Sequence, residues 1–322
     1  MHRRTFSIGL GAAAILASRT APAQQDSRPL TIVVPYPPGG ISDIVARLLA
    51  KSMAVTLNRS VLVENRPGGS TLIGTRLVQR AAPDGNTLLL HAHSFMMNPG
   101  TLQGADYDPI NDFEAVAKLT TSPYLMMVNK DVPARTPQEF IAWAKTQPQG
   151  VLWGSAGSGG SIQVMLRAFE RNIGAKTTLV PYKGNADIIT ALIGGQIHLT
   201  TTPPSAVFDS AAQAGHIRYI AITTGNPSPF YPDLPTLRSV VPTMPADQQW
   251  LALFAPRATP RPALEQLSGA VAKALDDPSV KEVLTKNKFQ VDYLDHADFG
   301  AFVRKSRADW EALIAASGIK FD

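Results

Sequence analysis

Cysteine is absent from the 322 residues, which is compatible with an oxidising compartment and leaves no thiol near the N-terminus to be lipidated. No apolar run reaches the ~20 residues that span a bilayer, so no transmembrane helix is expected. Lys and Arg form no block with interleaved aromatic residues, which excludes nucleic acid as a partner. The glycines complete neither a G-x-G-x-x-G fingerprint nor a P-loop, so no nucleotide is implied and no cofactor is expected.

The first 23 residues have the composition of an export signal. Arg3 and Arg4 precede a short Ala/Gly-rich apolar run, and residues 21–23 supply the small side chains that signal peptidase reads. We therefore predict that residues 1–23 are cleaved and that the mature protein is periplasmic. The paired arginines resemble a twin-arginine signal, although their flanking residues depart from it, so the general secretory route stays open. The signal holds three arginines and no acid, so its removal lowers the net charge from +5 to +2.

The mature chain repeats one pattern: a short apolar run, a loop of small polar residues, and an amphipathic stretch. One example is residues 31–34, followed by a Pro/Gly loop and by apolar residues at helical spacing from Ile44. A second is residues 151–153, which lead into a Gly/Ser loop and a helix that carries Met165 and Phe169. Strands that alternate with helices predict an α/β fold with largely parallel sheets.

No long Pro- or Ser-rich linker divides the chain. Two lobes would therefore have to be joined by strands that cross between them, and residues 124–129 and 217–223 are the predicted crossings. This assigns residues 28–124 and 224–322 to a discontinuous first lobe. Residues 125–223 form the predicted second lobe.

Ligands of open α/β sheets bind beyond the carboxyl ends of the strands, and here those ends carry Gly, Ser, Thr, Asn and Tyr. Each leads into a helix N-terminus, whose free N–H groups attract anions, so a carboxylate could be held without an Arg. In the loop around Gly40, Ser42 or Asp43 can cap the next helix, and a plain strand-to-helix turn is an equal alternative. The loop 154–161 holds three Ser and four Gly and favours a donor-rich cradle over a simple flexible turn.

A catalytic alternative rests on residues 156–160, which match the relaxed A-x-S-x-G form of a nucleophile elbow centred on Ser158. Histidines that could serve it follow at positions 198, 216 and 296. Ser155 and Ser161 beside it are better explained as a run of hydrogen-bond donors than by one activated nucleophile, and no Asp–His pair is evident. We therefore predict a binding protein and keep an exported serine hydrolase as the alternative.

A metal site is the second alternative. His91 and His93 could present both imidazoles on one face of a strand, as metal ligands require. No Cys, Asp or Glu follows at ligand spacing, so a structural or exposed pair is the favoured interpretation and no metal is expected.

The loops also match, in order, a set of motifs that extends over the whole mature chain. They are Val33–Tyr36 with Gly39–Asp43, Val63–Gly69, Ala82–Leu89, Tyr107–Phe113, Pro181–Gly184, Gly194–Ile197, Pro232–Thr236, Leu253–Pro256 and Trp310–Lys320. In this set the chain resembles the Bug family, the extracytoplasmic receptors of tripartite tricarboxylate transporters. No single motif is unique to that family, but the ordered set is highly specific.

The resemblance implies a type II periplasmic-binding-protein fold, in which two α/β lobes joined by crossing strands close on a ligand in the cleft between them. It further implies a small organic carboxylate (mono-, di- or tricarboxylate, or an aromatic acid), held by amides, hydroxyls and water, and membrane transporter subunits as partners. We expect a monomer. The ligand-binding residues implied by the resemblance are Tyr36, Gly40, Ser42, Asp43, Ser94, Ser155, Ser158, Ser161, Tyr182, Lys183, Gly184, Asn185 and Thr202.

The chain departs from the family pattern at two positions. His198 and Thr202 stand where the family often has Asp. Losing a carboxylate there would suit a more anionic ligand or would reflect a different pocket wall, and in both cases we expect an altered pocket, so ligand identity does not transfer from relatives. A periplasmic sensor or adaptor on the same fold is a further alternative.

Overall fold

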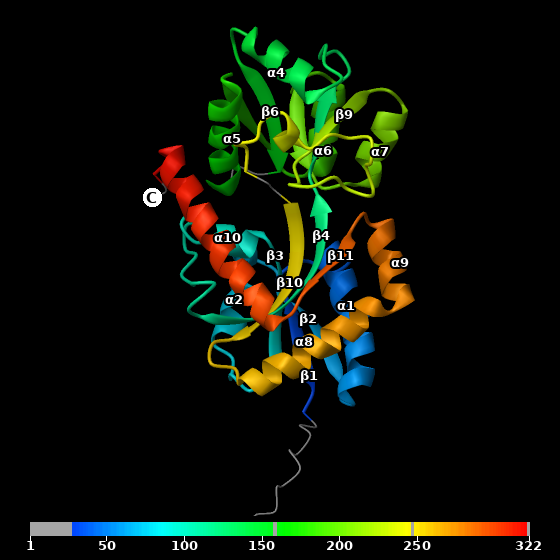
Figure 1. Ribbon diagram of the computed structural model, residues 1–322, viewed down its shortest axis with the longest axis vertical. Coiled ribbons are helices and arrows are strands. Elements are labelled where there is room, and N and C mark those ends of the chain that lie inside the picture. The colour runs from blue at the N-terminus through cyan, green and yellow to red at the C-terminus, as the bar shows by residue number, and fades with distance from the viewer. Residues whose placement is uncertain (1–27, 157–159, 246–247, 321–322) are drawn as a thin grey trace, which may run out of the picture.

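The protein folds into two lobes, each built on its own β-sheet (Figure 1). The computed structural model describes residues 28–156, 160–245 and 248–320. The predicted signal peptide and Ser158 lie outside these residues. In the described part of the chain, no helix is long and apolar enough to cross a membrane.

The first sheet has six strands in the order β11-β4-β10-β3-β1-β2. Their bounds are β1 Leu30–Val34, β2 Val61–Asn65, β3 Thr87–Ala92, β4 Phe113–Pro123, β10 Gln248–Pro256 and β11 Gln290–Leu294. β1 runs parallel to β2 and β3, whereas β10 is antiparallel to both of its neighbours, β3 and β4. β10, which comes late in the sequence, is therefore an internal strand of a sheet whose other internal strands come from the first part of the chain.

Helices cover both faces of the first sheet. Leu88 and Leu90 of β3 pack on one face, with α1 (Ile41–Leu57), α8 (Arg261–Asp276) and α9 (Pro278–Lys286). Leu89 packs on the other face, with α2 (Leu72–Gln79), α3 (Ser94–Met97) and α10 (His296–Ser317); the short helix η1 (Gly69–Thr71) precedes α2. Burial on both faces explains why these strands are continuous apolar runs rather than alternating ones.

The second sheet has five strands in the order β7-β6-β8-β5-β9. Their bounds are β5 Leu125–Asn129, β6 Val151–Ala156, β7 Thr177–Tyr182, β8 Leu199–Thr202 and β9 Ile217–Ile222. Met126 and Val128 face α4 (Pro137–Lys145) and α5 (Gly160–Ile173). Leu125 and Met127 face α6 (Asn185–Ile193) and α7 (Ala206–Gln213).

The chain passes from the first sheet to the second at Tyr124, directly between β4 and β5, and returns just before β10. The predicted crossing segment 124–129 contains Tyr124, but its other residues form β5. The predicted segment 217–223 does not cross, because β9 pairs with β5 inside the second sheet. The predicted boundary at residue 223 differs as well. Leu237 of the short helix η2 (Leu237–Ser239), Val241 and Met244 are buried in the core of the second sheet. We therefore place residues 224–245 with the second lobe.

Candidate ligand-binding site

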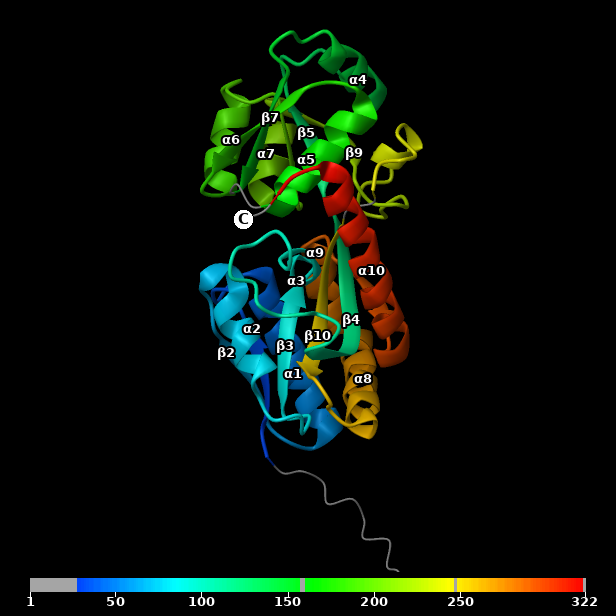
Figure 2. The ribbon, with the colours of Figure 1, turned by 90° about the vertical axis from the view of Figure 1, so that its left-hand side faces the viewer.

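The carboxyl ends of the parallel strands in both sheets lie next to the chain crossing. Ala92, at the end of β3, pairs with Leu251 near the start of β10. Thr202, at the end of β8, pairs with Leu125 at the start of β5. Because β5 and β10 each adjoin a crossing, both strand ends lie near the junction of the lobes, and Figure 2 shows the β3 arrow pointing toward the second lobe. We call the residues at, and directly after, the carboxyl ends of β1, β3, β6, β7 and β8 the strand-end site.

Two predicted residues of the first lobe, Tyr36 and Ser94, come together. The Tyr36 hydroxyl lies 3.1 Å from Nδ1 of His91 and 3.4 Å from Oγ of Ser94, and it accepts a hydrogen bond from the Ala92 N–H at 3.3 Å. Burial raises the pKa of Tyr36 to about 12. Burial lowers the pKa of His91 to about 3. Both groups are therefore neutral at physiological pH.

The proton on His91 can be placed from its neighbours. Nδ1 lies 3.0 Å from the Ala92 carbonyl oxygen, which can only accept, so Nδ1 carries the hydrogen. Nε2 then accepts from the Thr71 hydroxyl at 3.1 Å. His91 was missed as a positioning residue because its interaction with Tyr36 spans 55 positions of sequence.

Asp43 holds the first loop in shape. The side chain is buried and accepts hydrogen bonds from the Gly39 N–H at 2.9 Å and from Nδ2 of Asn65 at 3.0 Å, and it pairs with Arg47 at 3.0 Å. Although desolvation opposes ionisation, the hydrogen bonds from Arg47, Gly39 and Asn65 lower the pKa of Asp43. Its carboxylate is therefore fully used inside the lobe, which favours a positioning role. Ser42 beside it is also buried, whereas Gly40 is exposed.

In the second lobe the predicted residues lie at, or just after, the carboxyl ends of three strands. Ser155 and Thr202 are buried, and the Thr202 hydroxyl donates to the Pro203 carbonyl oxygen at 3.1 Å. Ser161 and Tyr182 are partly buried. The exposed side chains are those of Lys183 and Asn185, on either side of Gly184.

Three helices that begin at the strand-end site have no side-chain cap. Their N-cap residues are Gly40 for α1, Gly184 for α6 and Ser205 for α7. The Ser205 Oγ is buried and has no hydrogen-bond partner among the described residues. Uncapped first turns present backbone N–H groups and the positive end of a helix dipole, which suit an anion. Ser205 was absent from the predicted set, although its place in the Thr-Thr-Pro-Pro-Ser loop after β8 was a usable signal.

The expectation that His198 alters the pocket was wrong. His198 immediately precedes β8, at the amino end of that strand, so it lies at the opposite end from Thr202 and the strand-end site. Its Nδ1 accepts the Leu152 N–H at 2.9 Å, and its ring contacts Trp143 edge-on at 5.3 Å. It is a structural histidine of the second lobe.

The other histidines also have structural surroundings. His93 Nε2 lies 3.0 Å from the Tyr124 hydroxyl, whereas His91 Nε2 contacts Thr71, so the two do not share a target. Within the described ranges no cluster of three His, Asp or Glu could hold a metal ion. His216 precedes β9 and His296 begins α10, where it lies 3.7 Å from Glu265, so neither follows a strand end of the site.

The fold and the strand-end site define a two-lobed solute-binding protein. Over residues 45–319 the chain matches the family described as the tripartite tricarboxylate transporter family receptor. It is 30% identical to a Cupriavidus necator protein from the gbd 5′ region over 99% of both chains. It is 26% identical to BugT of Bordetella pertussis, with 98% of this chain and 96% of that one covered.

Solved structures agree. A TctC solute-binding protein from Polaromonas superposes with a TM-score of 0.78 at 28% identity, covering 90% of this chain and 99% of that one. MatC from Rhodopseudomonas palustris, solved with bound malate, gives 0.70 at 28% identity and covers 90% and 99%. Another R. palustris protein, solved with adipate, gives 0.75 at 28% identity and covers 92% and 99%.

This chain therefore belongs to the tripartite tricarboxylate transporter receptor family. The predicted resemblance to the Bug proteins and the predicted fold class are confirmed. The family and the fold are those of periplasmic solute-binding receptors and not of enzymes, so the serine-hydrolase alternative is set aside.

Proposed function

We propose that this protein captures a small organic mono- or dicarboxylate at the strand-end site and delivers it to the membrane subunits of a tripartite tricarboxylate-type transporter. The observation that carries the proposal is the set of three uncapped helix N-termini at facing strand ends, of α1, α6 and α7. Backbone N–H groups of such turns donate to carboxylate oxygens without a paired cation. The ligands of two relatives, malate and adipate, are carboxylates of this kind.

The two lobes contribute to capture differently. In the first lobe, the loop around Gly40 is held by Asp43, so its exposed amides have a defined direction. In the second lobe, Ser205 and the Gly184 turn supply donors whose partners would come from the ligand. A ligand that touches both lobes binds the closed arrangement more tightly than the open one, and this difference in affinity drives closure.

The ligand class is tested by a thermal-shift screen of the mature protein, residues 24–322. Malate, adipate, monocarboxylates and aromatic acids form the test set, and neutral sugars and amino cations form the control set. A ligand at 100 times its Kd stabilises the native state by about 2.7 kcal/mol, which raises the midpoint by several degrees. A shift with the control set and none with any carboxylate would overturn the proposed ligand class.

The site is tested with Ser205→Ala. Its hydroxyl has no partner among the described residues, so the free energy of unfolding should change little. If the ligand uses this hydroxyl, the Kd should rise about fivefold to tenfold, as for the loss of one hydrogen bond to a charged group. Ser210→Ala, on the exposed face of α7, the helix that Ser205 precedes, is the matched control. Equal Kd values in both variants would remove Ser205 from the site.

Export is tested with Arg3 and Arg4 both changed to Lys. If the twin-arginine route is used, the precursor should accumulate in the cytoplasm and the cleaved form should disappear from the periplasm. Unchanged processing after Ala23 would assign the signal to the general secretory route.

A further inference from the structure

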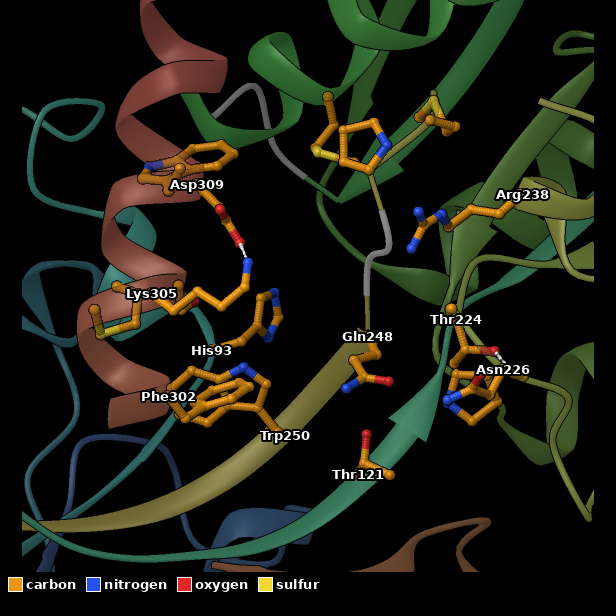
Figure 3. A pocket seen from close by; sticks show the side chains of 18 of the residues that line it. His93, Thr121, Thr224, Asn226, Arg238, Gln248, Trp250, Phe302, Lys305 and Asp309 are labelled. Carbon is orange, nitrogen blue, oxygen red and sulfur yellow. Dashed lines mark hydrogen bonds and ion pairs between the residues drawn. The ribbon is translucent and has the colours of Figure 1, made fainter. Parts of the chain in front are cut away.

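A cavity of about 980 Å³ lies between the lobes on the side of α10 (Figure 3). Thr121 of β4 and Gln248 of β10 form its floor, and residues 224–228, 238 and 242–245 of the second lobe face them. We call it the hinge-side cavity, because β4 and β10 are the strands beside the two crossings. Its volume is at the upper end of the range of small-molecule sites.

The hinge-side cavity is separate from the strand-end site. None of the described residues predicted to bind the ligand lines it. It lies on the face of the first sheet that α10 covers, around β4, β10 and β11, whereas the strand-end site follows β1 and β3. His93, directly after β3, lies at a strand end of the strand-end site and also lines the cavity, so the two sites adjoin there.

One wall of the cavity is apolar and fixed. Trp250 is buried, and its ring meets the ring of Phe302 edge-on at 5.9 Å between centroids. Met96 adds a thioether to the same wall. Aromatic rings and thioethers that are already packed can take an apolar ligand body without rearrangement.

The charges around the cavity are paired, with one exception in the described chain. Lys305 pairs with Asp309, and Asp292 pairs with the buried Lys118. Arg238 extends from the second lobe toward the cavity centre, and its guanidinium contacts no acceptor among the described residues. A guanidinium that extends into a cavity without an acceptor favours a carboxylate, to which it can donate two parallel hydrogen bonds.

A second polar group faces the same space. The imidazole of His93 projects into the cavity, and its Nδ1 is buried without a hydrogen-bond partner in the described structure. Burial lowers the pKa of His93 to about 4, so the ring is neutral. When the Tyr124 hydroxyl donates to Nε2 across their 3.0 Å contact, Nδ1 carries the hydrogen and is a donor. A buried donor without a partner is unfavourable, and a ligand oxygen would satisfy it.

We propose that the hinge-side cavity is a second binding site, for an amphipathic monocarboxylate with an aromatic or medium-length aliphatic body. The carboxylate pairs with Arg238 of the second lobe and accepts from Nδ1–H of His93 in the first. The apolar body lies against Trp250, Phe302 and Met96. An occupant held in this way contacts both lobes beside the hinge strands β4 and β10.

The experiment uses 4-phenylbutyrate as the probe and follows binding to the mature protein by calorimetry and by tryptophan fluorescence, since Trp250 and Trp310 line the cavity. We expect saturable binding. Two matched compounds separate the interactions: 4-phenylbutyramide removes the charge, and butyrate removes the ring. Both should bind at least about tenfold more weakly, because each lacks an interaction worth more than about 1.4 kcal/mol.

Arg238→Met keeps much of the side-chain length and removes the charge. It should weaken 4-phenylbutyrate about tenfold or more and leave the Kd of the strand-end carboxylate within about twofold. Arg135→Met, at another exposed arginine of the same lobe, is the control. Ser205→Ala should leave 4-phenylbutyrate binding unchanged, which separates this site from the proposed function.

Three results would overturn the second site. One is the absence of 4-phenylbutyrate binding at millimolar concentration to the folded wild-type protein. Another is equal affinity in wild type and Arg238→Met. The third is displacement of the probe by the strand-end carboxylate together with loss of probe binding in Ser205→Ala, which would place the probe in the strand-end site.

Discussion

The two halves of the strand-end site differ in how far their polar groups are already used. In the first lobe, Tyr36, His91 and Thr71 form a hydrogen-bonded chain, and Asp43 accepts from three donors. In the second lobe, Ser205 Oγ has no partner among the described residues, and the turn at Gly184 has no side-chain cap.

The first lobe therefore supplies a rigid loop, and the second lobe supplies polar groups that are still available to a ligand. Polar groups that already have hydrogen-bond partners inside the first lobe gain little from a ligand. Their hydrogen bonds instead hold the loop around Gly40, whose backbone amides face the proposed ligand. Unsatisfied groups in the second lobe gain the most when a ligand arrives, because their desolvation cost is already present in the free protein. Substitution of these polar groups in the first lobe should therefore lower the free energy of unfolding. Substitution of Ser205 in the second lobe should change the Kd of the ligand and leave the free energy of unfolding nearly unchanged.

Among the single substitutions, the largest effect is expected for Asp43→Ala. The change removes the carboxylate that accepts from the Asn65 amide, the Gly39 N–H and Arg47, so the free energy of unfolding should fall by about 2–4 kcal/mol. Urea unfolding measures the loss.

Asp131→Ala is the control for that measurement, because Asp131 is exposed and pairs with Lys130 at the surface. It should cost less than about 0.5 kcal/mol. If both variants lost the same small amount, Asp43 would not organise the first loop.

The next effect concerns pH. In the folded protein the pKa of His91 is lowered to about 3 and that of His93 to about 4, both by burial. Between pH 6.5 and 4.5 the unfolded chain therefore takes up protons on these rings while the folded protein does not. The free energy of unfolding should fall as the pH falls through this window, by up to about 1.4 kcal/mol per pH unit for each ring.

Urea unfolding at several pH values measures this slope, and His93→Gln should reduce it by about the contribution of one ring. His296→Gln is the control, since that imidazole lies near Glu265 at the start of α10. An unchanged slope in His93→Gln would show that the ring is protonated in the folded protein.

The smallest effect is expected for Ser70→Gly. Ser70 has a φ of 53°, in the left-handed region, between β2 and α2. Glycine adopts this conformation without strain, so the change should raise the free energy of unfolding by about 0.5–1 kcal/mol. Thr71→Gly would relieve a φ of 81° but lose the hydroxyl bonded to His91, so no such gain is expected. A thermal melt that ranks the two variants equally would contradict the role of Thr71.

Much of the fold and part of the site could be predicted from local pattern. Apolar runs followed by Gly/Ser loops identified β1, β6 and the helices after them, because strand ends and helix starts leave short-range signals. The placement of Gly40 and Gly184 at helix N-termini followed from the same signals.

The rest depended on contacts between distant residues. Asp43 resembles a ligand residue in sequence, and only the approach of Asn65 shows that its oxygens are used. His198 was counted with the pocket because the sequence does not show where β8, a strand of only four residues, begins. Leu237 and Met244 join the second lobe through packing that no local period reveals.

The position of β10 has a consequence for synthesis and folding. Residues of β3 pair with partners such as Leu253, more than 160 positions later, so the first sheet lacks an internal strand until that part of the chain has left the ribosome. Residues 125–245 are contiguous and form the second lobe without that delay. Because non-local pairing forms late, we expect the second lobe to be structured on the ribosome while the first is still an unfinished sheet with an unpaired edge for chaperones to shield.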